Sequence, residues 1–314
     1  MLKKILKITK SGIKYISDPL FRFSINSSKF HMYDRVEDEK YLKLRYKRSF
    51  GKELDLQNPL TFTEKLQWLK LYDRRDEYTT MVDKFKAKSL VATLIGHEYI
   101  IPTIGIWTDP DEIDFDSLPE KFVLKCNHNS GLGMYICRDK SKIDIPRIKR
   151  DLRKGLSQDY YLTSREWPYK NVERRIIAEE YMEDSNYGEL RDYKFFTFGG
   201  KPKVLYIAQG RGSVGSTVAD FFDMDFKHLP FTIDHNMAEI PPEKPKNFEL
   251  MKQLAAKLSE GTPQLRVDFY EVDGQVYFGE MTFFHCSGFE GFHPEEWDKT
   301  FGEWVTLPGR VDKE

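Results

Sequence analysis

From Leu265 to Glu280 the chain reads Leu-Arg-Val-Asp-Phe-Tyr-Glu-Val-Asp-Gly-Gln-Val-Tyr-Phe-Gly-Glu, two β-rich runs on either side of an Asp-Gly pair. This pattern predicts a β-hairpin. A two-residue loop would pair residue 272 with residue 275 and put Asp268 and Glu280 on opposite faces. A three-residue loop, with Gly274 in the left-handed conformation, would pair residue 271 with residue 275 and put both carboxylates on one face. We favour the three-residue loop.

In the favoured register one face of the hairpin is charged. Arg266 lies opposite Glu280, Asp268 lies diagonal to Glu280, and Thr282 follows on the same face. The other face is mostly apolar and carries Val267, Phe269, Tyr277, Gly279 and Met281. Two inward carboxylates beside an arginine are suited to Mg²⁺ and phosphate. A solvated strand face with an exposed Arg–Glu pair would give the same pattern, so the rest of the chain has to decide.

The composition is that of a packed globular protein of roughly two domains. Of its 314 residues, 40% are hydrophobic and 14% aromatic, and the formal net charge of -1 provides no field that would attract nucleic acid. The three cysteines are odd in number and form no CxxC pair, which argues against a disulfide framework. No apolar run is long enough to span a membrane. We therefore expect a cytoplasmic enzyme or binding protein.

Element patterns change along the chain. Residues 20–98 read as mainly helical, with a helix start at Asn58–Glu64 and a further helix over Met81–Leu94. Later short apolar runs predict strands at Phe122–Asn127, Gly133–Cys137, Arg175–Met182, Tyr193–Phe198, Val204–Ala208, Leu265–Val272 and Gln275–Phe283. Helices are expected at Ile145–Leu156 and Asn247–Ser259. Because strands and helices mix without a regular βαβ rhythm, the predicted fold class is α+β.

The first residues form a basic, amphipathic pattern. Its lysines are Lys3, Lys4, Lys7, Lys10 and Lys14, and its apolar residues are Leu2, Ile5, Leu6, Ile13 and Ile16. Such a helix would lie on an anionic membrane surface. An ordinary helix packed on the domain fits the same pattern, and Gly12 interrupts it. Both interpretations stay open.

Other segments have features of a nucleotide site. The apolar strand that carries Lys125 leads into a loop with Ser130 and Gly131, where backbone N–H groups could approach phosphate. The strand that ends at Glu179 and Glu180 offers a carboxylate to an adenine amino group. The glycine-rich stretch 210–217 lacks the lysine of a P-loop, so we expect a mobile substrate-covering loop there instead.

These segments, in order, resemble the ATP-grasp superfamily, with a layout similar to D-alanine–D-alanine ligase. The matching motifs are Asp83-Lys84, Val123-Leu124-Lys125, Glu179-Glu180-Tyr181-Met182, Asp192-Tyr193-Lys194, Arg266-Val267-Asp268 and Gly279-Glu280-Met281-Thr282. Three stretches, 58–65, 192–202 and 278–283, resemble the branch named for TupA, the teichuronopeptide-biosynthesis protein. The resemblance covers about residues 50 to 305.

The resemblance implies an ATP-grasp fold, two α+β subdomains that grip ATP, with a helical N-terminal region over residues 1–80 and the ATP-grasp domain over 81–314. It also implies roles for individual residues. Lys84, Lys125, Ser130, Gly131, Glu179, Glu180, Met182 and Asp192 would bind ATP, with the two lysines on phosphates, Glu179 and Met182 on adenine and Asp192 on ribose. Asp268, Glu280 and Thr282 would bind Mg²⁺, while Arg266 and Lys194 would be catalytic. Thr282 stands where such ligases usually have asparagine, so a second metal would bind more weakly.

The implied reaction is that of a carboxylate–amine ligase. A carboxylate is phosphorylated by ATP, and an amine then displaces phosphate to form an amide. In the TupA-like branch this would attach an amino acid to a uronic acid or acidic glycan of a bacterial surface polysaccharide, in the cytoplasm or at the inner face of its membrane. A glycosyltransferase of the same pathway, using Asp223 and Asp225, and a non-catalytic protein with an ATP-grasp shell are the alternatives. The adjacent His285 and Cys286 fit no zinc spacing, and we expect them in the core or lining the acceptor pocket.

Overall fold

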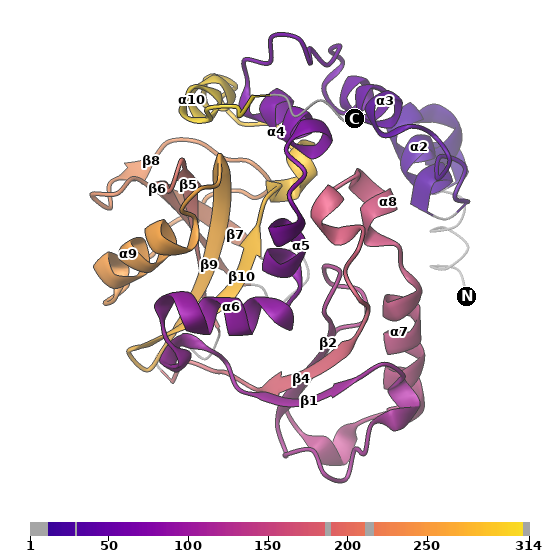
Figure 1. Cartoon of the computed structure of the whole chain (residues 1–314), viewed down its shortest axis with the longest axis vertical. Helices are drawn as coiled ribbons and strands as arrows, with labels where there is room; N and C mark the ends of the chain where they lie inside the picture. Colours follow the sequence, from indigo (N-terminus) through magenta and orange to yellow (C-terminus); the bar gives the residue numbers. More distant parts are fainter. Residues whose placement is uncertain (1–11, 29, 186–189, 211–216, 310–314) are drawn as a thin grey trace.

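Two antiparallel sheets organise the chain (Figure 1). The computed structural model describes residues 12–28, 30–185, 190–210 and 217–309. One sheet has the order β1 (Thr103–Trp107), β4 (Ile176–Glu180), β2 (Phe122–Cys126), β3 (Tyr135–Cys137). The other has the order β10 (Gln275–Thr282), β9 (Gln264–Val272), β5 (Asp192–Phe198), β6 (Lys201–Gln209), β7 (Val218–Phe222), β8 (His228–Leu229). The predicted α+β class is confirmed.

Helices cover these sheets and connect them. The α-helices are α2 (Pro19–Ser28), α3 (Asp38–Phe50), α4 (Phe62–Tyr72), α5 (Asp76–Val82), α6 (Lys86–Ile95), α7 (Ile145–Ser157), α8 (Tyr160–Ser164), α9 (Phe248–Leu258) and α10 (Glu296–Trp304). Short 3₁₀ turns are η1 (His97–Tyr99), η2 (Pro110–Glu112), η3 (Lys140–Lys142), η4 (Trp167–Tyr169) and η5 (His285–Gly288). Helix α4 begins where a helix start was predicted, because Thr61 and Glu64 form a reciprocal capping box.

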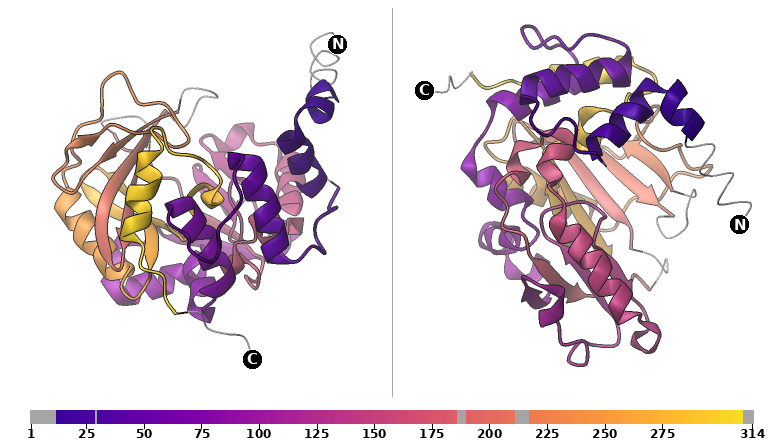
Figure 2. Two further views of the ribbon diagram at one scale, coloured as in Figure 1. Left: turned by 90° about the horizontal axis from the view of Figure 1, so that it is seen from above. Right: turned by 90° about the vertical axis from the view of Figure 1, so that its right-hand side faces the viewer.

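Each sheet packs into its own apolar core. Phe122, Leu124 and Ile176 of the four-stranded sheet pack with Ile148 and Leu152 of α7. The core of the six-stranded sheet also takes in the helical N-terminal region, including Tyr41, Leu42, Phe62 and Leu66. In Figure 2 the indigo helices lie against the pink helical segment, and Tyr41 Oη donates to the carbonyl of Thr163 there (3.0 Å). The domain boundary at residue 80 stays a prediction.

The single helix predicted over Met81–Leu94 is wrong, because the chain breaks at Asp83 into α5 and α6. Asp83 Oδ1 accepts hydrogen bonds from the backbone N–H groups of Phe85 (2.9 Å) and Lys86 (3.3 Å), and from the side chain of Asn127 (2.8 Å). The backbone N–H of Lys84 donates to the carbonyl of Asn127 (3.2 Å). The break therefore fixes Lys84 beside the end of β2.

The three-residue hairpin loop is also wrong. Asp273 (φ 50°) and Gly274 (φ 85°) form a two-residue loop with both residues at positive φ, typical of a type I′ turn, and residue 275 pairs with residue 272. The positive φ of Gly274 is confirmed. A shift between Phe278 and Glu280 then leaves Gly279 as an extra residue in β10.

This bulge returns the carboxylates to a common face. Glu280 pairs directly with Asp268, and Thr282 pairs with Arg266. The predicted charged face is thus present, but Glu280 pairs with Asp268 instead of Arg266, a shift of two residues. Tyr277 pairs with Tyr270, which takes it off the apolar face where we expected it. A side chain on Gly279 would come within 3.1 Å of the Asp268 carbonyl oxygen, which explains the glycine at the bulge.

Two of the predicted segments fall largely outside the described residues. They are the basic stretch, of which residues 1–11 are not described, and the loop at 210–217, of which residues 211–216 are not described. In the part of the chain that is described, no helix is both long and apolar enough to cross a membrane.

Candidate active site

Arg266 of β9 connects the charged side chains of the hairpin. Its guanidinium donates to both oxygens of Asp268, with Nε–Oδ1 and Nη2–Oδ2 distances of 2.8 Å each. Nη2 also lies 3.0 Å from Glu280 Oε1 and 3.0 Å from Thr282 Oγ1. The predicted residues of this face therefore form one hydrogen-bonded cluster. The bidentate pairing fixes the plane of the guanidinium, which is what recognition of a phosphoryl or acyl phosphate group requires.

Lys194 of β5 joins the same cluster. The β5–β9 register pairs it with Asp268, and its Nζ lies 2.5 Å from Asp268 Oδ2 and 3.3 Å from Asp192 Oδ2. Burial lowers the pKa of Lys194, while Asp268 acts in the opposite direction. Asp192, predicted to bind ribose, is buried with its carboxylate directed at this lysine.

The two predicted metal ligands differ in exposure. The side chain of Asp268 is 1% exposed, whereas that of Glu280 is 38% exposed and accessible to a ligand. Burial would raise the pKa of Glu280, but the charges of Lys84, Arg266 and Lys194 outweigh it and bring the pKa to about 2. Glu280 is therefore ionised at neutral pH.

These donors fit a hard divalent cation. Asp268 and Glu280 supply carboxylate oxygens from adjacent strands, with the Thr282 hydroxyl 3.3 Å from Glu280 Oε1. A carboxylate has about four acceptor sites, so the bonds from Arg266 and Lys194 leave room for a shared cation. Oxygen donors of this kind are those that Mg²⁺ prefers.

The four-stranded sheet contributes a second charged group. Glu179 of β4 lies between two lysines, with Oε1 2.7 Å from Lys88 Nζ and Oε2 2.5 Å from Lys125 Nζ. Burial would raise the pKa of Glu179, but Lys125 and Lys88 outweigh it and the pKa is lowered. Sequence reasoning missed Lys88, which lies on α6. Glu180 lies at the exposed end of β4, and Met182 follows it, half-buried, in the connection to β5.

Charges from both groups act on Lys84. Its Nζ donates to the carbonyl of Asn129 (2.6 Å), directly before the exposed Ser130 and Gly131. Burial lowers the pKa of Lys84, and its strongest charged neighbours are Glu280, Lys125 and Glu179, in that order. The charges of Glu280 of one sheet and Glu179 of the other thus both act on Lys84 and oppose the effect of burial on its pKa.

A second contact of Arg266 was not predicted. Its Nη1 lies 2.7 Å from His285 Nδ1, and because a guanidinium only donates, Nδ1 must be the acceptor. The ring proton of His285 is then on Nε2, which lies 3.5 Å from Cys286 Sγ. Burial and the charge of Arg266 lower the pKa of His285 to about 3, so the ring is neutral. The only sequence signal was its position three residues after Thr282.

His285 also belongs to a group that resembles a metal site by distance alone. One ligand atom each of Asp234, His285 and Cys286 lie within 4.8 Å of one another. Because Nδ1 accepts from Arg266, a cation on Nε2 would require an imidazolate, which is costly. The group is better described as a hydrogen-bonded support for Arg266, continued by the Cys286–Asp234 contact of 3.6 Å. His285 is buried in the core, one of the two placements we expected for it.

The glycosyltransferase motif has a local structural role. Asp223 Oδ1 accepts hydrogen bonds from the backbone N–H groups of Asp225 (3.0 Å) and Lys227 (2.8 Å), in the turn between β7 and β8. Two strands, β5 and β6, lie between β7 and β9 in the sheet. Asp223 thus caps a turn and does not join the charged cluster.

The two antiparallel sheets, one carrying Lys125 and Glu179 and the other carrying Lys194 and the acidic hairpin, form an ATP-grasp fold. The TupA-like ATP-grasp family model matches residues 64–306, and the chain belongs to that family. Members of the ATP-grasp family are ligases. The expected resemblance is confirmed. No curated protein matched the chain.

Solved structures with a similar fold share little sequence with the chain. D-alanine–D-alanine ligase from Bacillus anthracis, complexed with ATP, is 16% identical with a TM-score of 0.37, over 65% of this chain and 53% of that one. The Helicobacter pylori ligase is 13% identical with a TM-score of 0.41, over 78% and 69%. Biotin carboxylase from Campylobacter jejuni is 15% identical with a TM-score of 0.38, over 78% and 49%. The chain thus spans about half the length of the Bacillus anthracis ligase.

Proposed function

We propose that this protein is an ATP- and Mg²⁺-dependent carboxylate–amine ligase that forms an amide through an acyl phosphate. The observation that carries the proposal is the charged cluster of the six-stranded sheet, in which Arg266 contacts Asp268 and Glu280 and Lys194 contacts Asp268. Glu179 of the other sheet, held by Lys88 and Lys125, adds to it. Phosphoryl transfer needs this arrangement, because catalysis rests on positioning and on neutralising phosphoryl oxygens.

In the first step a carboxylate oxygen of the substrate attacks the γ-phosphorus of ATP, and ADP leaves. Lys84 and Lys125 bind the phosphates, and Mg²⁺, when bound to Asp268 and Glu280, would neutralise charge on them. In the second step the amine nitrogen attacks the carbonyl carbon of the acyl phosphate, inorganic phosphate leaves, and the amine proton passes to solvent. Arg266, held by Asp268 and His285, stabilises the oxyanion of that step.

We further propose that the carboxylate belongs to a uronic acid or acidic glycan and that the amine is an amino acid. Support comes from membership of the TupA-like family, the branch that the sequence resemblance connects with teichuronopeptide biosynthesis. Such precursors are built on a lipid carrier at the inner face of the cytoplasmic membrane, so we place the enzyme there. Mass spectrometry of the surface glycan from wild-type and deletion strains tests the assignment, and it should show loss of an amide-linked amino acid. An unchanged glycan would contradict it.

A nucleotide-binding screen separates the ligase from the glycosyltransferase. We expect tight binding of ATP with Mg²⁺ and none of UDP-sugars. Binding of a UDP-sugar without ATP would favour the transferase, although the Asp223 side chain accepts backbone hydrogen bonds in a turn of this structure.

A further inference from the structure

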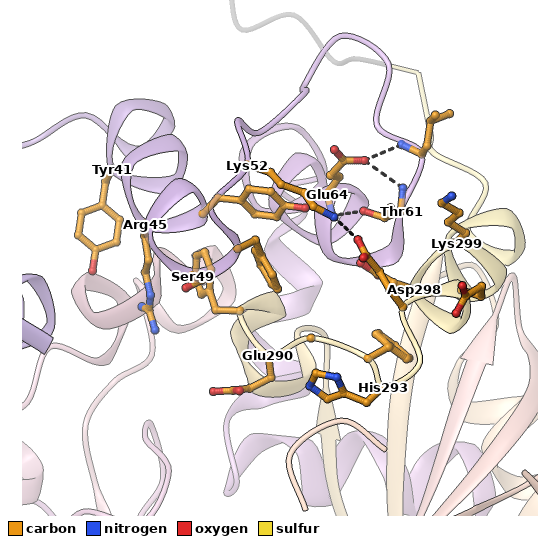
Figure 3. A pocket seen from close by; sticks show the side chains of 18 of the residues that line it. Tyr41, Arg45, Ser49, Lys52, Thr61, Glu64, Glu290, His293, Asp298 and Lys299 are labelled. Carbon is orange, nitrogen blue, oxygen red and sulfur yellow. Dashed lines mark hydrogen bonds and ion pairs between the residues drawn. The ribbon is translucent and has the colours of Figure 1, made fainter. Parts of the chain in front are cut away.

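A large cavity, none of whose lining residues belongs to the charged site, is not used by the mechanism above. It has a volume of about 1330 Å³ and lies between α3, the start of α4 and the chain after η5 (Figure 3). Its wall includes Tyr41, Arg45, Tyr46, Phe289, Glu290 and His293. The volume exceeds that of pockets for small ligands, about 300–1,000 Å³. It can therefore hold a substrate together with the group attached to it.

One wall of the cavity presents a fixed arginine. Arg45 Nη1 donates to the carbonyl of Thr163 and to Ser164 Oγ (2.9 Å), and its guanidinium carbon lies 4.1 Å from the centroid of the Phe289 ring. Among the described residues, its Nε and Nη2 groups have no hydrogen-bond partner. The guanidinium is thus held in place by its stacking and by one nitrogen, and its remaining donors are free for a ligand.

A negative charge lines the cavity on the loop that follows η5. Glu290 directly follows Phe289, and Figure 3 shows Arg45 reaching down from α3 and Glu290 extending from that loop on the same side of the cavity. No ion pair joins Arg45 to Glu290 among the described residues. Burial and the charge of Asp234 raise the pKa of Glu290, whereas Arg45 lowers it. A cation and an acid therefore line the same side of the cavity without forming an ion pair.

This end of the cavity adjoins the reaction centre. Phe289 follows η5, whose first residue His285 contacts Arg266. Ser287 of η5 donates to Glu166 (2.5 Å), and the charges of both Arg45 and Arg266 act on the pKa of Glu166. The charges of Arg45 and Arg266 thus both reach Glu166, whose side chain accepts a hydrogen bond from Ser287.

We propose that the amine substrate binds here as an α-amino acid, with its carboxylate on Arg45 and its ammonium group facing Glu290. This proposal rests on the proposed ligase function. The free donors of Arg45 suit the two oxygens of a carboxylate. The carboxylate of Glu290 suits the ammonium group of the amine before it loses its proton and attacks the acyl phosphate. An amine without a carboxylate would lose the contact with Arg45.

Equilibrium dialysis tests this site without any need for turnover. The protein is dialysed with ADP and Mg²⁺ against a mixture of the proteinogenic amino acids, or against the matching amino acid amides, and retained compounds are measured by mass spectrometry. The variants are Arg45→Gln, Arg45→Lys and Glu290→Gln. Arg48→Gln is the matched control, because Arg48 also lies on α3 and stacks on a ring, that of Phe23, but does not line the cavity.

We expect the wild type and Arg48→Gln to retain one or a few amino acids and none of the amides. Arg45→Gln and Glu290→Gln should retain at least about tenfold less, with ADP retention unchanged, and Arg45→Lys should be intermediate. Equal retention in Arg45→Gln, or no amino acid retained by a wild type that binds ADP, would overturn the site. If the wild type does not retain ADP in dialysis, the proposed function is contradicted instead. If Arg45→Gln loses ADP through misfolding, Arg45→Lys and Glu290→Gln decide.

Discussion

Removing Asp268 should destabilise the protein far more than removing Glu280, although both changes should abolish turnover. Asp268 is 1% exposed and binds two buried cations, Arg266 at 2.8 Å and Lys194 at 2.5 Å. Breaking a buried ion pair from one side costs about 3–5 kcal/mol. Glu280 is 38% exposed and accepts one bond from Arg266, whose other bonds remain, so its loss should cost about 1 kcal/mol.

The assay is thermal unfolding of Asp268→Ala and Glu280→Ala, followed by circular dichroism. At about 2 °C per kcal/mol for a chain of this size, Asp268→Ala should lower Tm by about 5–10 °C and Glu280→Ala by about 2 °C. Equal shifts in the two variants would refute the reasoning.

The pH dependence gives a further check. Burial lowers the pKa of Lys194, and the charge of Asp268 is the strongest effect that raises it. Without Asp268, the pKa of Lys194 in the folded protein should therefore fall further. Between that pKa and the unfolded value of 10.5, the unfolded state binds more protons, and stability rises with pH. The Tm difference between Asp268→Ala and the wild type should therefore narrow as the pH is raised from 7 towards 10. A difference that widens would contradict the placement of Lys194.

Three further changes test other parts of the structure. Gly279→Ala puts a Cβ 3.1 Å from the Asp268 carbonyl oxygen. It should lower the free energy of unfolding, measured with urea, by about 1–3 kcal/mol, and it should remove most of the activity, measured as ADP release. Glu179→Gln should lower Tm at pH 7, but less at pH 3, because the lowered pKa of Glu179 gives stability that is complete above its unfolded value of 4.5 and lost as the pH falls through the folded pKa. Deletion of residues 1–16 should abolish salt-sensitive binding to anionic vesicles, while activity on a small substrate survives. Equal vesicle binding by the truncated and full-length proteins would favour the packed helix over the membrane helix.

The charged face of the hairpin could be predicted from residue types, but its register could not. In a regular hairpin with a two-residue loop, Glu280 lies on the face opposite to Arg266 and Asp268. The three side chains can share a face only if the loop or one strand contains one extra residue. We placed that residue in the turn, whereas it is Gly279 in β10. A glycine inside a strand is itself a signal for a bulge, and it would have corrected the register.

Other features depended on tertiary contacts that no local pattern carries. The break at Asp83 could have been found from its capping ability, but its bond from Asn127 comes from a distant strand. Strand β1 was missed because it contains Gly105 and its isoleucines are partly exposed. The pairing of Lys88 with Glu179 requires the docking of α6 against β4, which periodicity does not give.

The most direct test of the central claim is the identity of the products made from ATP. The purified protein would be incubated with ATP, Mg²⁺, a uronic acid-containing glycan fraction and amino acids, and followed by ³¹P NMR. An ATP-grasp ligase should release ADP and inorganic phosphate in equal amounts, and Glu280→Ala should release neither. Release of AMP and pyrophosphate, or turnover of a nucleotide sugar without ATP, would contradict the account.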